Sequence, residues 1–459
     1  MIVDPGFARL LKELREQRHL SLRTLGRQVH CSHGYLWDLE AKGKRPSIAV
    51  AALLDAALDA GGRLSAMVRE VSADSGVWSA AENGSVDPSA SVLEFAPDWR
   101  HGVDAVVELW RMDTQRRGAL RGIGFSASAF VSPAMRWLTA PLDERPASNG
   151  ERLVGSPDVE MVRRITGAYR TLDNQFGGGH VRESLVRFLD GEVAPLLRGR
   201  YDADTGSALL SAVAETTQLA GWASYDAGMN GLAQRYMVQA LRLAAASGDR
   251  PLGAEILAAM SHQAAYLRAS VDAVDLARAA SRAAADAGVA AIQAESAVLE
   301  AQGHAVGGNE AACASALDRA ERALDRADRT GDPQWMGYFD ESYLAAKFGH
   351  CFTALGRGDL AHRFAERSLE MDGRHYARGR QFNLALLAVA HVQRGEPEQA
   401  ASIGMQAAEA AEGLHSARAL VYLDDLAQRL ARYAGLPQVQ VFAERARPLL
   451  AAATTASSL

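Results

Sequence analysis

A glycine-spaced helix repeat runs through the second half of the chain. A glycine is followed by a small residue five positions later and by another twelve positions later. The copies are Gly228/Ala233/Ala240, Gly308/Cys313/Ala320, Gly356/Ala361/Ser368 and Gly395/Ala400/Ala407, with a weaker one at Arg268/Ala273/Ala280. Each copy starts between two segments of helical length, and small residues at fixed positions let paired helices approach closely. The repeat therefore predicts stacked helix pairs that share one core.

The rest of the 459-residue chain also favours helix. Alanine is abundant, aromatic residues make up only 7%, and no convincing run of strands is present, so we expect an all-α protein. The length exceeds that of a single core, which predicts separate folding units. The three cysteines, Cys31, Cys313 and Cys351, form no CxxC pair. We therefore expect neither a disulfide framework nor a zinc site.

Residues 1–71 are predicted to form a bundle of five short helices, the last of them after the glycines at 61–62. Ser21 and Ser32 can cap the second and third helices, and Leu36 is expected to face inward. Two short helices joined by a tight turn, the second of them polar on its outer face, are typical of a helix-turn-helix.

The stretch LSLRTLGRQVHCSHGYLWDLEAKGKRPS resembles the lambda-repressor-like DNA-binding domain of the Cro/repressor-like (XRE) family. The matching residues are Ser21, Leu25, Ser32, Leu36, Glu40 and a basic turn that closes on Pro46. In that family an arginine of the first helix pairs with the glutamate near the end of the recognition helix. The resemblance therefore implies a structural ion pair between Arg15 and Glu40. Two departures are Lys42, where the family usually has glycine, and Leu22, where it often has glutamine.

The basic turn and the outer face of the third helix are the predicted DNA contacts. The first fifty residues carry nine Lys/Arg against five Asp/Glu, in a chain of net charge −6. Lys42, Lys44 and Arg45 are expected to neutralise phosphates, while His33 and Asp38 are candidates for reading base edges. A merely solvated surface is the alternative for all of these residues. The remaining candidates are Ser32, Arg23, Arg27 and Trp37, the last of which is expected to pack rather than to intercalate.

Composition divides the remainder of the chain. The Ser/Ala/Gly-rich stretch at 72–98 is predicted to be a flexible linker. Residues 99–203 are assigned to a helical connecting and dimerisation region, and residues 204–452 to the repeat domain. Arg116 and Arg117 precede a mildly apolar stretch, similar to a twin-arginine export signal. That stretch lies far inside the chain and is too short to span a bilayer, so we expect a helical hairpin.

The repeat units resemble tetratricopeptide repeats (TPR), in which a glycine ends the first helix of each pair. Their spacing of 39 to 48 residues exceeds the usual length of about 34, so we expect a degenerate TPR-like α-solenoid of about five pairs. First-helix residues should line its concave groove, although aromatic residues at helical spacing are more often core. The groove candidates, which suit a peptide, a small ligand or a protein partner, are Gln218, Trp222, Tyr225, His262, Tyr266, Gln302, Trp335, Tyr338, Tyr343, Lys347, His350 and Asn383.

Motifs of catalysis and cofactor binding are missing from the sequence. The glycine run at 177–179 has no strand before it and is predicted to be a helix-ending loop rather than a phosphate cradle. We therefore expect no enzymatic activity, no cofactor and no metal site.

The combined pattern predicts a sequence-specific DNA-binding transcriptional regulator whose helical domain dimerises and senses an effector. Segments such as WMGYFDESYLAAKFGHCFTALG resemble large actinobacterial regulators of this kind, which implies a role in development or secondary metabolism. The expected partners are double-stranded DNA and a second copy of the chain, in the cytoplasm at the nucleoid, with no membrane contact. The alternatives are a TPR scaffold that binds no DNA and a regulator whose sensor domain is an enzyme.

Overall fold

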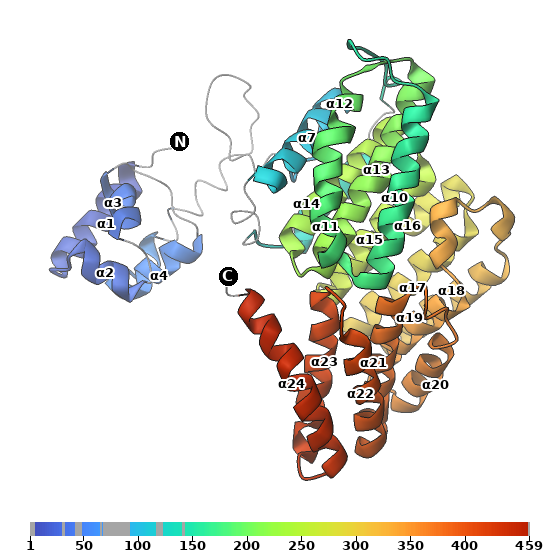
Figure 1. Ribbon diagram of the computed structural model, residues 1–459. Coiled ribbons are helices and arrows are strands. Elements are labelled where there is room, and N and C mark those ends of the chain that lie inside the picture. The colour runs from blue at the N-terminus through green and yellow to red at the C-terminus, as the bar shows by residue number, and fades with distance from the viewer. Residues whose placement is uncertain are drawn as a thin grey trace. The chain divides into compact units, whose positions relative to one another are not determined.

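The structure, a computed structural model, describes residues 5–29, 33–41, 48–64, 67, 92–115, 123–139 and 143–457. It divides into two compact units, residues 1–88 and 89–459 (Figure 1). The described residues are almost entirely helical, which confirms the all-α fold class. One small antiparallel sheet interrupts the helices, formed by β1 (Ser148–Asn149) and β2 (Arg200–Tyr201). No helix in the described part of the chain is long and apolar enough to cross a membrane.

The helices of the N-terminal unit enclose a small apolar core. They are α1 (Pro5–Gln17), α2 (Leu22–Gln28), α3 (His33–Ala41) and α4 (Ile48–Leu58). The fully buried side chains of this core include Leu11, Leu25, Leu36 and Leu54. Ser21 caps α2, because its Oγ accepts a hydrogen bond from the Thr24 backbone N–H at 3.1 Å. The fifth helix expected after the glycines at 61–62 lies mostly outside the described residues.

The second unit is a solenoid of helix pairs. The pairs are α13 (Ala203–Asp226) with α14 (Asn230–Ser247), α15 (Arg250–Tyr266) with α16 (Ser270–Ala287), α17 (Ala290–Val306) with α18 (Glu310–Asp325), α19 (Glu341–Ala354) with α20 (Gly358–Ser368), α21 (Ala377–Arg394) with α22 (Pro397–Ala411), and α23 (Ala417–Leu430) with α24 (Pro437–Ser457). Short 3₁₀ turns connect some of them: η3 (Arg329–Gly331), η4 (Gln334–Tyr338) and η5 (Ala431–Tyr433). The first five pairs carry the glycine-spaced repeat, and α23 with α24 forms a further pair without it.

The repeat marks the turn inside each pair. Gly228, Gly308, Gly356, Gly395 and the divergent Arg268 all have a positive φ, between +63° and +79°. Only glycine adopts this conformation without a steric penalty, which explains why it recurs at this position. The two small residues that follow each marker are buried, so the two helices of a pair pack closely.

A set of helices ahead of the array packs on its first pair. They are α7 (Trp99–Gln115), η1 (Ala127–Phe130), α9 (Val131–Thr139), α10 (Ser156–Phe176), α11 (Gly178–Phe188), the π-helical turn η2 (Leu189–Val193) and α12 (Ala194–Leu197). α7 contacts α14, α10 and α11 contact α13, and all share one apolar core with the array. Val92 and Phe95, inside the predicted linker, are buried in this core. Residues 72–91 and 116–122 lie outside the described residues.

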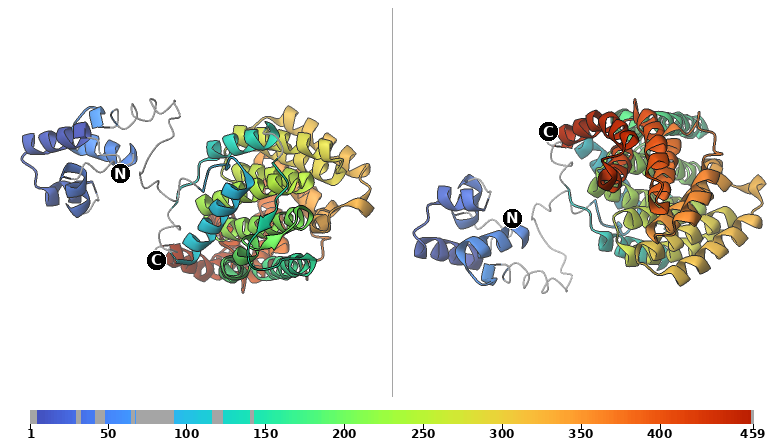
Figure 2. Two further views of the ribbon diagram at one scale, coloured as in Figure 1. Left: turned by 90° about the horizontal axis from the view of Figure 1, so that it is seen from above. Right: turned by 90° about the horizontal axis from the view of Figure 1, so that it is seen from below.

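The array closes on itself instead of presenting the open groove that the sequence predicts. α21 packs against α10, and the loops at 176–179 and 413–416, together called the seam, are joined by backbone hydrogen bonds. The His415 N–H donates to the Phe176 carbonyl at 2.7 Å, and the Gly179 N–H donates to the His415 carbonyl at 2.8 Å. Figure 2 shows the helices of the second unit curving round into a ring.

Glycine makes the close approach at the seam possible. Gly177 ends α10 with a φ of 89°, a conformation that other residues avoid. A Cβ on Gly178 would lie 2.6 Å from the Ala223 carbonyl oxygen, and a Cβ on Gly179 would lie 2.8 Å from the His415 carbonyl oxygen. Gly177 alone separates the two helices, because Gly178 and Gly179 already belong to α11, and this junction is also where the ring closes.

Candidate functional site

The outer face of α3 is the candidate nucleic-acid interface. Leu36 and Leu39 are fully buried against α1 and α2, so the opposite face of the helix is left to solvent. His33 and Gly34 are exposed there. Trp37, one turn further along, is 48% exposed. A short helix anchored by two leucines thus presents a polar and aromatic face of the kind that enters a DNA groove.

The other predicted DNA contacts are placed as follows. Asp38 is half-buried on α3, and Arg23 is exposed on α2. The backbone of Arg27 lies in α2. The Trp37 side chain is 48% exposed, so about half of its surface is packed, and its expected packing role stays a prediction. The remaining candidates lie outside the described residues: Ser32, Lys42, Lys44 and Arg45.

An ion pair fixes α3 to α1. Arg15 donates from Nε to Glu40 Oε1 at 2.7 Å and from its second terminal nitrogen to Oε2 at 2.8 Å. Its remaining nitrogen donates to the Leu20 carbonyl at 2.9 Å. The two side chains are only 14% and 6% exposed, and the hydrogen bond with Glu40 raises the pKa of Arg15. The pair joins the end of α1 to the end of α3, and so orients the exposed face.

Comparison with known families agrees with this geometry. Residues 7–68 match a family described as a helix-turn-helix domain. The matched segment covers α1 to α4, and it supports a DNA-binding regulator. No curated protein matches the chain.

The second candidate site lies inside the ring of the second unit. It is a cavity of about 240 Å³, lined by α10, η4 and the first helix of every pair. Eight of the predicted groove residues line it: Trp222, His262, Tyr266, Gln302, Tyr338, Tyr343, Lys347 and His350. Their role in binding remains a prediction.

Four of the predicted groove residues do not line the cavity. Gln218 stands behind the wall, where its side-chain N–H donates to the Glu255 carboxylate. Tyr225 is buried in aromatic packing, and Trp335 packs against the main core. Asn383 donates to a backbone carbonyl of α20 at 3.0 Å. These polar and aromatic groups serve the packing of first helices against their neighbours.

The lining residues follow the period of the repeat. One layer stands six residues before the marker of the first four pairs and consists of Trp222, His262, Gln302 and His350. A second layer stands thirteen residues before the marker of the second to fifth pairs and consists of Glu255, Glu295, Tyr343 and Phe382, of which Glu295 lies behind the lining. Equivalent positions of stacked pairs lie side by side, so this register could have identified the glutamates and Phe382, which our sequence prediction missed.

One end of the cavity is acidic. The Tyr338 hydroxyl donates to Glu295 Oε2 at 2.8 Å and lies 3.2 Å from Glu255 Oε1. The Tyr343 hydroxyl donates to Glu295 Oε1 at 3.1 Å. Burial, and then the Glu295 charge, raise the pKa of Glu255 to about 8, and burial also raises the pKa of Glu295. Two carboxyl groups so close together share protons rather than both ionising.

The other polar cluster of the cavity is basic. The Lys347 ammonium forms a hydrogen bond with His262 Nδ1 at 2.5 Å. Burial lowers the pKa of Lys347 to about 7, opposed by Glu295 and reinforced by Arg418. Burial and the Lys347 charge lower the pKa of His350 to about 3 and also lower the pKa of His262. Both imidazoles are therefore neutral at pH 7.

Arg418 is a buried cation of the cavity, surrounded by aromatic rings. Its guanidinium carbon lies 4.4 Å from the ring centroid of Tyr225, 4.7 Å from that of Phe382 and 5.3 Å from that of Tyr266. The nearest carboxylate oxygen, on Asp226, is 3.9 Å away. Arg418 Nε has no hydrogen-bond partner among the described residues. This residue is the strongest functional candidate that our sequence prediction missed, because α23 lacks the repeat marker.

Ion pairs hold the seam beside the cavity. Arg378 on α21 donates to both oxygens of Asp173 on α10, at 2.8 and 2.7 Å, and lies 3.2 Å from Asp226 on α13. Asp226 also accepts hydrogen bonds from the Gly178 N–H and the Ser416 hydroxyl, both at 2.8 Å. Groups from the two ends of the array therefore meet at the wall of the cavity.

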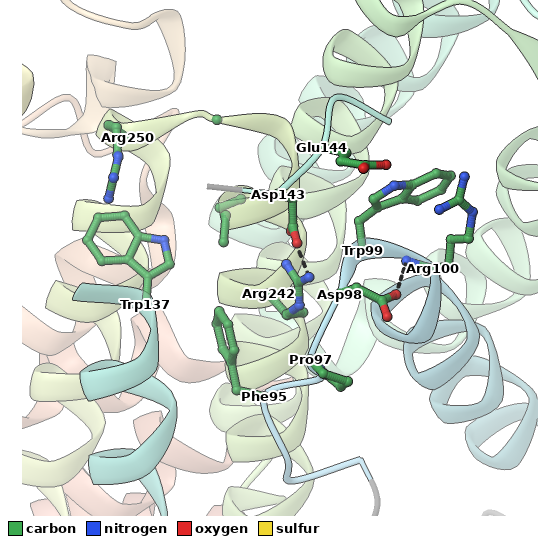
Figure 3. Close-up of a pocket in the computed structure, with 13 residues that line it drawn as sticks. Phe95, Pro97, Asp98, Trp99, Arg100, Trp137, Asp143, Glu144, Arg242 and Arg250 are labelled. Carbon is green, nitrogen blue, oxygen red and sulfur yellow. Dashed lines mark hydrogen bonds and ion pairs between the residues drawn. The ribbon is translucent and has the colours of Figure 1, made fainter. Parts of the chain in front are cut away.

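A second pocket, of about 330 Å³, serves packing (Figure 3). At its centre Arg242 on α14 is fully buried, donating from Nε to the Ala96 carbonyl at 2.8 Å and from a terminal nitrogen to Asp143 at 2.7 Å. Gln239, one turn earlier, donates to the Val92 carbonyl at 2.8 Å. Both side chains are occupied in fixing irregular segments to the array.

The chemistry of the ring cavity suits binding. Aromatic walls, one acidic end and one basic end can orient a ligand by a few polar contacts within an otherwise apolar enclosure. In the described part of the chain, no group of three or more His, Cys, Asp or Glu side chains is arranged to hold a metal ion. Cys313 and Cys351 are buried with free thiols.

Proposed function

We propose that the protein is a sequence-specific DNA-binding transcriptional regulator whose TPR-like array senses an effector and mediates dimerisation. The observation that carries the proposal is the presence, in one chain, of a helix-turn-helix domain and a cavity lined by polar, charged and aromatic side chains. The domain supplies the contact with DNA, and the cavity supplies a place for a small ligand, a peptide or part of a protein partner. The role of the cavity is binding rather than catalysis. The protein acts in the cytoplasm, at the nucleoid.

On DNA, α3 enters the major groove. His33 and Asp38 then reach base edges, and Asp38 can accept a hydrogen bond from cytosine N4. The cations predicted in the following turn, Lys42, Lys44 and Arg45, bind phosphates and release counterions. A dimer places two recognition helices about 34 Å apart, in successive turns of the major groove.

Sensing follows from the way the ring is closed. An effector in the cavity touches side chains from both ends of the array, so its binding free energy depends on how the two ends are held together. An effector shifts the protein between two arrangements only by its differential affinity for them. Occupancy of the cavity is thereby linked to the spacing of the two DNA-binding domains in a dimer.

The proposal is tested by measuring the affinity of the full chain for a pool of random-sequence duplexes at several salt concentrations. Affinity should fall steeply as salt rises, and selection from the pool should enrich one sequence. Replacing Lys44 and Arg45 by alanine should weaken binding to all sequences about equally and reduce the salt slope by about two. Asp38→Ala should instead change base preference. Lys12→Ala, on the exposed side of α1, is the matched control.

The scaffold alternative makes the opposite prediction. Binding that is insensitive to salt and to the Lys44/Arg45 double variant, with no sequence enriched, would show that the basic turn docks a protein. Sedimentation of the full chain tests the dimer separately, because a monomer at the concentrations that saturate DNA would contradict the dimeric arrangement.

A further inference from the structure

The anions at the seam side of the cavity are already paired. Both oxygens of Asp173 accept from Arg378. Both oxygens of Asp226 accept from protein donors, and Arg378 lies 3.2 Å from one of them. Arg170, which also lines the cavity, donates to Glu215 at 2.7 Å. These groups form closed ion pairs with one another.

The acidic end is likewise saturated. Two tyrosine hydroxyls and the Gln218 amide donate to Glu255 and Glu295. Because the pKa of Glu255 is raised to about 8, this carboxyl group is protonated at neutral pH. Glu295 lies near Lys347 and raises the pKa of that lysine against the effect of burial. A cationic ligand would have to displace the two tyrosine hydroxyls to reach either carboxyl group.

Arg418 is held by aromatic rings and by a long ion pair with Asp226, and its Nε is left without a hydrogen bond to any described residue. Aromatic rings cover the faces of its guanidinium, so only the edge that carries the N–H donors remains available. Its Nε is buried and makes no hydrogen bond to any described residue, and its only carboxylate neighbour, Asp226, is engaged elsewhere. A guanidinium always carries its charge, and its edge matches the two oxygens of a carboxylate.

The surroundings of Arg418 define what else a ligand must carry. Trp222, Tyr266 and Phe382 line the cavity with flat apolar surfaces. Gln302 also lines it, and Gln302 Oε1 is buried without a hydrogen-bond donor among the described residues. The volume of about 240 Å³ lies just below the range of about 300–1,000 Å³ typical of ligand pockets. A small molecule fits this volume, and the aromatic walls favour one that is flat.

Resting on the sensing role proposed above, we propose that the effector is a small aromatic carboxylic acid. Its carboxylate pairs with the edge of Arg418 on the basic side of the cavity, where Lys347 supplies a second cation. Its ring lies among the aromatic side chains, and a hydroxyl or N–H group on the ring donates to Gln302 Oε1. Because Arg418 belongs to the last pair of the array and Asp226 to the first, the carboxylate binds where the ring closes.

The charge of the ligand is tested with matched probes on the full chain. Each set contains an aromatic acid, its amide and the corresponding amine: 4-hydroxybenzoate, 4-hydroxybenzamide and 4-hydroxybenzylamine, with equivalent sets on indole and naphthalene rings. Calorimetry should show that acids bind and that their amides bind at least about tenfold more weakly, because the amides lose a charged hydrogen bond. Preference for the amines, or no acid binding with a Kd below about 1 mM, overturns the proposal.

Variants of Arg418 assign the carboxylate to its site. Arg418→Met keeps the aliphatic stem and should lower the affinity for the acid about 30-fold, abolishing its preference over the amide. Arg418→Lys keeps the charge and should restore part of that preference, which separates the loss of charge from a loss of folding. Arg429→Met is the matched control, on an exposed arginine of the same helix, and should bind as the wild type does. Unchanged acid binding by Arg418→Met, with the array still folded, contradicts the assignment.

Failure of this proposal differs from failure of the regulatory function. If DNA binding shows its steep salt dependence but no aromatic acid binds, the ligand class is wrong and the regulator stands. If the acids bind in an Arg418-dependent manner but leave the affinity for DNA unchanged, the cavity is a binding site and its link to regulation is wrong.

Discussion

The two units of this protein differ in whether their polar side chains face outward or inward. The helix-turn-helix domain has an apolar interior of leucines and presents its candidate contacts on the outside of one helix. The array does the reverse, because carboxyl, ammonium, imidazole and guanidinium groups line its interior cavity. One unit presents its candidate contacts to a large partner, and the other surrounds a small one.

The difference sets how each site depends on the rest of the fold. The α3 face needs only a short helix, its turn and the ion pair that orients it. The cavity needs the first helix of every pair, together with the seam loops at 176–179 and 413–416. We therefore expect damage to the first site to be local and damage to the second to spread through the array.

The largest effect is expected from Arg15→Met. Removing this arginine leaves Glu40, whose side chain is only 6% exposed, without its partner, and the free energy of unfolding of the N-terminal unit should fall by about 3 kcal/mol. DNA binding should be lost with it. Hydrogen–deuterium exchange followed by mass spectrometry reads the two units separately, and protection of the array should not change.

The double variant Arg15→Met/Glu40→Leu is the matched control, because it removes both charges together. It should recover most of the lost stability, since an apolar pair of similar volume replaces a pair of ions. If the single variant also lowers protection in the array, the two units are not independent and the contrast between them is wrong.

The helix-turn-helix domain could be predicted from sequence because its signals are local. Ser21, the leucine spacing and the basic turn all lie within about thirty residues, and each has one physical meaning in a short helix. The pair of Arg15 and Glu40 followed from the family resemblance. The exposure of Trp37 could not be predicted from sequence, because an aromatic side chain at helical spacing usually belongs to the core.

The cavity could be predicted only in part. The repeat predicts which helices face inward. The aromatic, amide and imidazole residues on these helices, such as Trp222 and Gln302, are the predicted lining. Glu255 and Glu295 were passed over because acidic residues on a helix are normally solvated, although they keep the repeat register. Arg418 could not be found, because nothing in the local sequence shows that the last pair returns to the first.

The next largest effect concerns pH. Burial and Glu295 raise the pKa of Glu255 from 4.5 to about 8, so between these values the folded array binds a proton that the unfolded chain has released. The free energy of unfolding must then fall as the pH rises through this window. Glu255→Gln removes the titrating group, and the variant should be about 2 kcal/mol more stable than the wild type at pH 8, by urea denaturation.

Other groups near Glu255 contribute to the pH dependence of the stability. Glu295 titrates together with it, and Arg170, Tyr338 and Gln218 also face it, so the midpoint of the pH dependence belongs to the pair. Glu409→Gln, on the exposed side of α22, is the control and should leave the pH dependence as it is. A wild-type array whose stability does not change between pH 5 and pH 8 would contradict the shared proton.

The smallest effect separates closure of the ring from helix stability. In Gly179→Ala the new Cβ would lie 2.8 Å from the His415 carbonyl oxygen, so the seam must move apart, at a cost of about 1.5 kcal/mol. Gly167→Ala, in the exposed middle of α10, meets nothing within 4 Å and should stabilise that helix by about 0.5 kcal/mol. The first variant should increase hydrogen exchange at both seam loops and the second should not. Equal behaviour of the two variants would mean that the ends of the array do not depend on each other, and a ligand held by Arg418 could then not report on closure.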